Sequence, residues 1–138
     1  MHDANQRKQV LLPYVRHMLL CENVKTDAEN RNRVTIEGLL SKIPSKEGRF
    51  PVKGDFSVYL QLSECRKAGQ GGIRVVDGES DEEIYPGKRF QLNFSSDPLR
   101  VYGIIIRVIG CSFPDPGLYF VEFVFEGTTL AREPLLVR

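Results

Sequence analysis

The stretch that most constrains the fold is residues 113–137, because it reads as two strands joined by a tight turn. It opens with a Pro/Gly breaker, FPDPG, which stops any regular structure before it. Large apolar residues then recur with a period of two, at Tyr119, Val121, Phe123 and Phe125. Glu126-Gly127 follows as a variant of the Asp-Gly hairpin signal, in which Gly supplies the positive φ that the turn needs. The stretch therefore predicts an antiparallel hairpin with a largely buried first strand.

The rest of the chain offers further strand candidates, separated by short turn-rich links. They cover residues 15–22, 33–43, 56–63, 73–76, 84–85, 89–94 and 99–109. In the clearest of them, alternate apolar residues face inward: Phe56, Val58, Leu60 and Leu62. The run 15–22 fits a short helix as well as a strand. Residues 69–72 (GQGG) read as a flexible turn, so 73–76 should pair back on the strand before it.

These candidates predict an all-β protein of seven to nine strands in two packed antiparallel sheets. We expect a single sandwich domain at residues 15–138, after a flexible N-terminal tail of residues 1–14. Gly38 lies in the middle of one strand candidate, which indicates a bulge or a close backbone approach. Phe50, in the loop that follows, is expected to plug an end of the core.

The charges point to no strongly charged partner. Nineteen Lys and Arg residues against eighteen Asp and Glu residues leave a formal net charge of +1. This balance predicts neither nucleic-acid nor membrane binding. An apolar run from Val10 to Cys21 follows Arg7 and Lys8, but Pro13 and the charged residues in the run argue against a signal peptide. We therefore expect a cytoplasmic protein.

The three cysteines, Cys21, Cys65 and Cys111, stand far apart in the sequence. No CxxC or Cys/His pair suggests a zinc site, and their odd number argues against a disulfide framework. Each is expected to pack as a small apolar side chain. A reactive thiol at Cys65, which Arg66 and Lys67 follow, is the alternative. No motif predicts a cofactor.

Three charged or titratable features remain as candidate sites. An acidic loop at residues 77–83 (DGESDEE) could gather oxygen ligands, but its spacing does not fit a calcium loop and favours a solvated hairpin loop. His17 has no second ligand near it in sequence and is interpreted as a packed or surface residue. Basic residues of two loop regions form a modest cluster that solubility explains equally well: Arg31, Arg33, Lys42, Lys46, Arg49 and Lys53.

The most apolar segment, residues 99–109 (LRVYGIIIRVI), is the strongest candidate for an interaction surface. Both of its alternating faces carry large apolar residues. The face of Tyr102, Ile104 and Ile106 is our candidate for an interface or a homodimer contact. The alternative is a central strand that is buried on one side and covered by a loop or the N-terminal segment on the other.

Several of these pieces together are similar to a known family. They are MLLCE at 18–22, IEGLLSKI at 36–43, and FPDPGLYFVEFVFEGTTLAREPLLV at 113–137. The chain resembles a group of small, uncharacterised bacterial domains of unknown function that are themselves similar to immunoglobulin-like sandwiches. The resemblance implies an immunoglobulin-like Greek-key fold, and it implies no activity and no functional residues. Independently, Tyr119 after a Pro-Gly corner predicts a tyrosine corner, in which the hydroxyl binds backbone a few residues upstream.

No nucleophile motif or phosphate-binding loop is present, so we expect no enzyme activity. The leading hypothesis is a non-catalytic protein-interaction or accessory module. The alternative is a domain that binds a small ligand or a carbohydrate on a sheet face. That alternative needs outward-facing aromatic residues, and the candidates are Tyr59, Tyr85, Tyr102 and Phe120.

Overall fold

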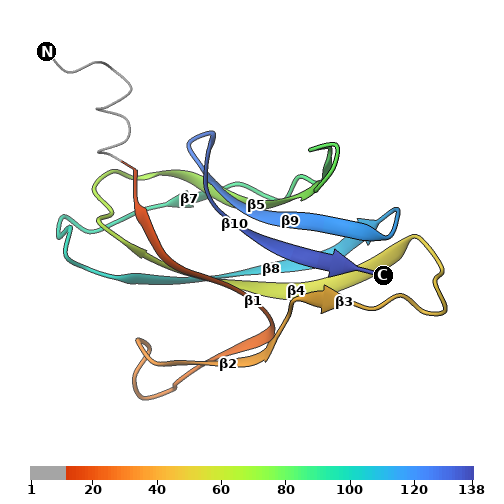
Figure 1. Cartoon of the computed structure of the whole chain (residues 1–138). Coiled ribbons are helices and arrows are strands. Elements are labelled where there is room, and N and C mark those ends of the chain that lie inside the picture. Colours follow the sequence, from red (N-terminus) through yellow and green to blue (C-terminus); the bar gives the residue numbers. More distant parts are fainter. Residues whose placement is uncertain (1–11) are drawn as a thin grey trace, which may run out of the picture.

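The computed structural model describes residues 12–138, which form two β-sheets packed face to face (Figure 1). The strands are β1 (Tyr14–Thr26), β2 (Val34–Leu39), β3 (Lys42–Ile43), β4 (Val52–Ser63), β5 (Gly69–Asp77), β6 (Glu83–Tyr85), β7 (Phe90–Leu92), β8 (Tyr102–Phe113), β9 (Gly117–Phe125) and β10 (Thr128–Val137). Most of the expected N-terminal tail, residues 1–11, lies outside the described part. Its last residues belong to the fold, because Leu12 packs against the core and Tyr14 begins β1.

One sheet has four strands in the order β2-β1-β4-β8, and the other has the order β3-β10-β9-β5-β6, with β7 also pairing with β5. Neighbouring strands are antiparallel except β3 and β10, which are parallel. The predicted all-β fold of two packed sheets is confirmed. Residues 12–138 contain ten strands instead of seven to nine, because the candidate at 33–43 forms two strands, β2 and β3.

The core lies between the sheets and is built by the two clearest alternating strands. Phe56, Val58, Leu60 and Leu62 of β4 are fully buried, as predicted. They share one hydrophobic cluster with Tyr119, Val121, Phe123 and Phe125 of β9. Full burial of an aliphatic or aromatic side chain of this size contributes roughly 1.5–3 kcal/mol. Phe50 packs against the same cluster, as expected from its place in the loop.

The structure decides one local alternative that the sequence left open and corrects two other local predictions. The run 15–22 is part of a strand and not of a helix. The candidate 33–43 is two strands, β2 and β3, which belong to different sheets. The prediction of a turn at 69–72 was wrong: these residues begin β5, which pairs with β9 instead of β4. Glycine suits this strand because a Cβ at Gly69 would lie 2.6 Å from the Phe125 ring.

The C-terminal hairpin forms as predicted. Glu126 and Gly127 both have positive φ, at 46° and 77°, and they join β9 to β10. The Tyr119 hydroxyl donates a hydrogen bond to the Asp115 carbonyl oxygen at 2.6 Å. The backbone N–H of Asp115 donates back to the same hydroxyl at 3.3 Å. This is the backbone contact expected of a tyrosine corner, and it holds the Pro/Gly breaker against the start of β9.

Strand β1 is shared between the body and a protruding hairpin, residues 22–39, which we call the hairpin arm. The first half of β1 pairs with β4 up to Cys21, and its second half pairs with β2 alone. Figure 1 shows that the arm folds back beneath the four-stranded sheet (orange, below β1 and β4). Val24, Val34 and Ile36 are half-buried whereas Lys25, Thr35 and Glu37 are exposed. The arm therefore has one covered face, and it adds a partial third layer.

Candidate functional site

The structure places the predicted interface residues on the inward face of β8. Ile106 is only 8% exposed, and Tyr102 and Ile104 pack against the core. This corrects the assignment of the faces. Both faces are apolar in sequence, so the side that enters the core is decided by pairing: Ile104 lies opposite Leu60 and Ile106 opposite Val58, and both of these residues of β4 point inward.

The outward face of β8 and its approach carry the exposed apolar residues instead. Five of the eight large hydrophobic residues that are exposed within residues 12–138 lie here or just across the gap between the sheets. They are Leu99, Val101, Ile105 and Ile109, together with Phe90 of β7. Phe90 and Ile109 line one cleft of about 290 Å³ beside β8. We call this set the β8 edge surface.

β8 is also an edge strand. One side pairs with β4 over almost its whole length, and no strand within residues 12–138 pairs with the other side. An irregularity interrupts the pairing where Asp55 of β4 lies opposite Ile109 and Gly110. There the Asp55 carboxylate accepts the Gly110 N–H at 2.6 Å, and Gly110 has a φ of 66°. Such a bulge ends the regular edge at its C-terminal side.

A second surface lies where the hairpin arm folds under the sheet. The end of the arm and the outer face of the sheet enclose a cleft of about 740 Å³, which we call the arm cleft. Its lining residues come from the arm, from β1, from β4 and from the start of β8: Arg16, Thr26, Arg31, Asn32, Val34, Tyr59, Gln61, Arg100, Val101, Tyr102, Gly103 and Ile105. Three are arginines, and none is acidic.

The sequence indicated only one of these arginines, Arg31, as a member of the modest basic cluster. Arg16 reaches the cleft because β1 has a register shift between Val15 and His17. Arg100 stands just before β8 and lies 5.1 Å from the centroid of the Tyr102 ring. No local pattern could have found this set, because the three residues are distant in sequence and line one cleft only in the folded chain.

The sheet surface next to the cleft is well packed. Tyr59, Ser57 and Cys21 point away from the sandwich core, yet none is more than 6% exposed. The Arg107 guanidinium spans this surface, donating from Nη1 to the Ser57 hydroxyl at 3.0 Å and to the Glu22 carbonyl at 2.9 Å. Arg107 thus connects β8 through β4 to the point where β1 leaves the sheet, and it supports the base of the arm.

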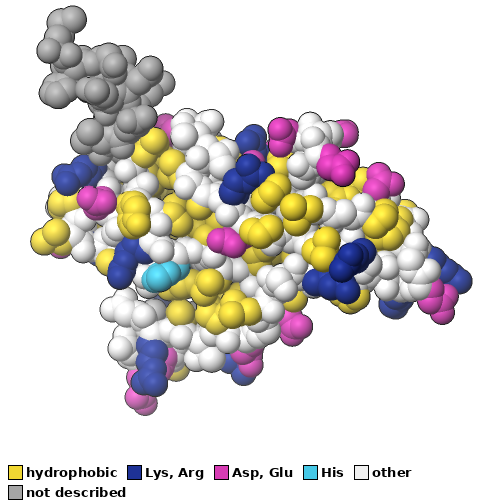
Figure 2. All heavy atoms as spheres, in the orientation of Figure 1, with side chains coloured by type: hydrophobic (Ala, Val, Ile, Leu, Met, Phe, Trp, Pro, Cys, Tyr) yellow, Lys and Arg dark blue, Asp and Glu magenta, His cyan; other side chains and the backbone are white. Residues whose placement is uncertain are grey.

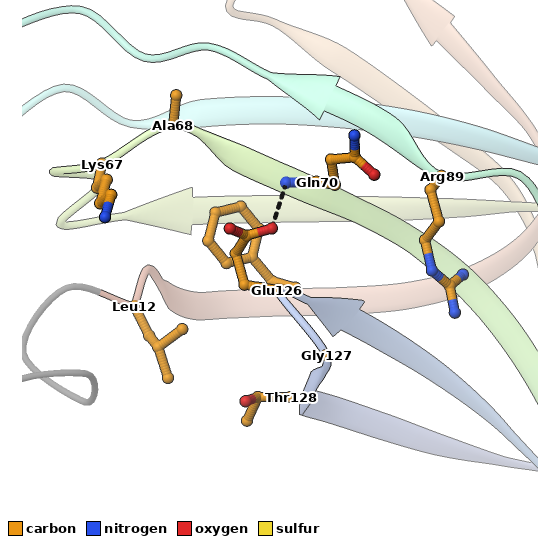
Figure 3. Close-up of a pocket in the computed structure, with 9 residues that line it drawn as sticks. Leu12, Lys67, Ala68, Gln70, Arg89, Glu126, Gly127 and Thr128 are labelled. Carbon is orange, nitrogen blue, oxygen red and sulfur yellow. Dashed lines mark hydrogen bonds between the residues drawn. The ribbon is translucent and has the colours of Figure 1, made fainter. Parts of the chain in front are cut away.

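A further cleft of about 440 Å³ lies at the turn between β9 and β10 (Figure 3). Glu126 sits at its centre, with Lys67 and Arg89 on either side. The Glu126 carboxylate accepts the backbone N–H of Gln70 at 3.0 Å, which ties the turn to β5. Because that carboxylate is used within the fold, and because the cleft borders Leu12, the first described residue, we assign no ligand to it.

The three cysteines are free thiols and all are buried, as expected of small apolar side chains. Burial raises the pKa of the Cys65 thiol to about 11 and that of Cys111 to about 12. Burial also raises the pKa of Cys21, and nearby Arg107 only partly offsets this effect. Burial therefore disfavours the thiolate that a reactive cysteine needs, at Cys65 as at the other two positions.

The acidic loop folds around its own first residue. The Asp77 carboxylate accepts the N–H groups of Glu79 at 2.8 Å and Ser80 at 3.1 Å, and these bonds lower the pKa of Asp77. His17 is exposed on β1, opposite Gln61. In the described part of the chain, no three His, Cys, Asp or Glu residues come together as a metal site would require.

The aromatic candidates for a carbohydrate platform do not form one surface. Tyr59 is buried, whereas Tyr85, Tyr102 and Phe120 are half-buried. Arg132 covers the Phe120 ring at 3.6 Å from its centroid. Tyr59 and Tyr102 meet at the arm cleft, and Tyr85 lies at the cleft beside β8. Figure 2 shows basic and acidic side chains interspersed on the face in view, with hydrophobic ones between them.

Comparison with known proteins identifies the family. The model for a family of unknown function (DUF6941) matches residues 16–138. The chain belongs to this family. The match covers all ten strands except the first two residues of β1, so the body and the hairpin arm are both included. No curated protein and no solved structure matches the chain. Among residues 12–138, no helix is long and apolar enough to cross a membrane.

Proposed function

We propose that the protein is a non-catalytic protein-interaction module that presents the unpaired edge of β8 to an extended strand of another polypeptide. The observation that carries this proposal is the long β8 edge with its exposed apolar side chains. An unpaired edge offers N–H and C=O groups to an added strand, and neighbouring apolar side chains supply contact area.

The occupant we propose is a second copy of the chain, because residues 101–109 (VYGIIIRVI) are self-complementary when two copies run antiparallel. With Ile105 opposite itself, Val101 lies opposite Ile109 of the second copy. Arg107 then lies opposite Gly103 of the second copy, so no like charges meet. The pairing is symmetric, as a two-fold dimer requires. It would join two four-stranded sheets into one continuous sheet.

The dimer should be weak and concentration-dependent. Pairing two edge strands buries less than the roughly 1,600 Å² of a standard stable interface. Sedimentation velocity over a concentration series tests this: the sedimentation coefficient of the natural chain should rise from the monomer value toward the dimer value. A chain that remains monomeric at every concentration would contradict the second-copy proposal.

A matched pair of variants locates the contact. Ile109→Lys places a charge in the proposed interface, whereas Leu118→Lys places the same charge on an exposed apolar residue of the other sheet. Ile109→Lys should abolish the dimer, and Leu118→Lys should leave it intact. The reverse result would place the contact elsewhere.

Two further points accompany this proposal. The cytoplasm is the compartment that we propose, and three free buried thiols support it, since disulfides are rare in reducing compartments. An immunoglobulin-like relationship is supported by the Tyr119 hydroxyl bond to Asp115 within a two-sheet sandwich.

A further inference from the structure

The arm cleft contains three arginines that the strand-pairing role does not use. Arg16, Arg31 and Arg100 enter it from three segments of the chain. A guanidinium is permanently charged and presents its N–H groups as a fork that matches the oxygens of phosphate or carboxylate. Three such groups around one cleft are an arrangement suited to an oxyanion with more than one charge.

The charge of these arginines is not balanced at the cleft. No carboxylate lines it, and none of the ion pairs within residues 12–138 includes Arg16, Arg31 or Arg100. Two carboxylates of the adjoining turns bind backbone instead. Asp27 accepts the N–H of Glu29 at 2.8 Å, and Asp97 accepts the N–H of Leu99 at 2.9 Å. Like charges that share a cleft repel, and a bound anion relieves that repulsion.

Neutral groups complete the lining. Gln61 Nε2 donates to the Tyr59 hydroxyl at 3.4 Å, which leaves the hydroxyl proton of Tyr59 available to a ligand oxygen. Thr26 and Asn32 add a hydroxyl and an amide from the arm. Val34, Val101 and Ile105 supply an apolar wall against which the organic body of a ligand can pack. The cleft volume of about 740 Å³ falls within the range of small-molecule sites.

We propose that the arm cleft binds a small molecule that carries a multivalent oxyanion, held by Arg16, Arg31 and Arg100. A small molecule is favoured over a nucleic acid, because the site is a single cleft on a chain of net charge +1. All three arginines are exposed, so binding weakens as salt screens their charges. The ligand also bridges the arm to the sheet and therefore holds the arm in place.

Isothermal titration calorimetry of the full chain at low salt tests the site with two probes, inorganic pyrophosphate and citrate. Saturable binding of pyrophosphate alone would identify a phosphate ligand, and saturable binding of citrate alone a carboxylate ligand. Both probes failing to bind would overturn the proposal. So would an oligonucleotide whose affinity rises with its length and exceeds that of pyrophosphate.

Substitutions then assign the arginines. Arg16→Gln, Arg31→Gln and Arg100→Gln should each raise the Kd about ten-fold, since one charge-assisted hydrogen-bond pair is lost. Arg33→Gln is the matched control, because Arg33 is an exposed arginine of the same arm that does not line the cleft. An equal loss in Arg33→Gln would show a general charge effect and contradict the site.

Two controls keep the result interpretable. Unfolding midpoints in urea should be similar for all four variants, which excludes misfolding as the cause of lost binding. Ile109→Lys, which disrupts the proposed dimer, should bind the probe as the natural chain does, because Ile109 does not line the arm cleft. Failure of the dimer and failure of the anion site are therefore separate outcomes.

Discussion

Arg74 Nε lies 2.7 Å from a carboxylate oxygen of Glu122, whose side chain is only 8% exposed. Arg74 also donates from Nη2 to the Thr129 hydroxyl at 3.0 Å, and Arg132 lies 3.8 Å from the second oxygen of Glu122. The cluster links β5, β9 and β10 side by side on the outer face of the six-stranded sheet. Its buried member, Glu122, depends on these partners for its charge to be tolerated there.

We expect Arg74→Ala to lower the free energy of unfolding by about 2 kcal/mol, because a buried carboxylate loses its nearest partner. Lys25→Ala is the comparison, since Lys25 pairs with Glu37 at 3.4 Å with both side chains exposed. That exposed pair should contribute less than about 1 kcal/mol. Urea unfolding measures both values, and equal losses would argue against a special role for Glu122.

Tyr119→Phe should destabilise the protein by about 1 kcal/mol, because the Asp115 carbonyl oxygen loses the hydroxyl that donates to it. The ring, which packs edge-on against Phe113, is retained in this variant. Tyr14→Phe removes a hydroxyl from an exposed residue and serves as the control. Thermal unfolding of the two variants gives the comparison. An unchanged melting temperature in Tyr119→Phe would show that the hydrogen bond between Tyr119 and Asp115 makes no net contribution to stability.

Stability should fall as the pH rises from 9 toward 11. Burial raises the pKa of Cys65 from its ordinary value of 9.0 to about 11, and that of Cys111 to about 12. Above pH 9 the unfolded chain releases these protons whereas the folded chain keeps them, so the free energy of unfolding decreases with pH. The stabilisation is complete below pH 9 and is lost as the pH approaches the folded values. Tyr119, whose pKa burial also raises, acts in the same direction.

Urea titrations at several alkaline pH values measure this slope, which we expect to be roughly 1 kcal/mol per pH unit for each thiol. Cys65→Ala and Cys111→Ala should each flatten the slope, whatever they do to the stability at pH 7. A slope that neither substitution changes would mean that other groups cause the pH dependence.

Arg107→Met should loosen the hairpin arm. The substitution keeps an unbranched side chain but removes both the bond to the Glu22 carbonyl and the bond to the Ser57 hydroxyl. We expect a loss of about 1–2 kcal/mol in stability and faster amide exchange that begins at the base of the arm. Hydrogen exchange resolved over residues 22–39 measures it. Exchange that rises equally in β9 would indicate global destabilisation instead.

The sequence predicted correctly those strands in which the burial of every second side chain is enough to identify the inward face. Phe56 to Leu62 and Tyr119 to Phe125 could be placed because each strand has one fully apolar face. The face of β8 was misassigned because both of its faces are apolar, so only its register with β4 decides the matter. The segment 69–72 was read as a turn because glycines usually end strands, whereas here they make room for the rings of β9.

The candidate sites depended even more on the fold. Arg16, Arg31 and Arg100 lie in unrelated segments, and nothing in their local sequence marks them as neighbours. They line one cleft because β1 continues beyond β4 and carries the arm, with Arg31, back under the sheet that holds the other two. The unpaired edge of β8 is likewise a property of strand order, which the periodicity of a single strand does not contain.

β1 belongs both to the sandwich and to the hairpin arm, and this arrangement has a consequence for redesign. The turn of the hairpin arm, residues 27–33, hydrogen-bonds within itself through Asp27 and Asn30, and none of its residues belongs to the core. Its length and side chains can therefore be exchanged without disturbing the sandwich. Because this turn supplies one wall of the arm cleft, such exchanges make the protein a scaffold on which new ligand preferences can be selected.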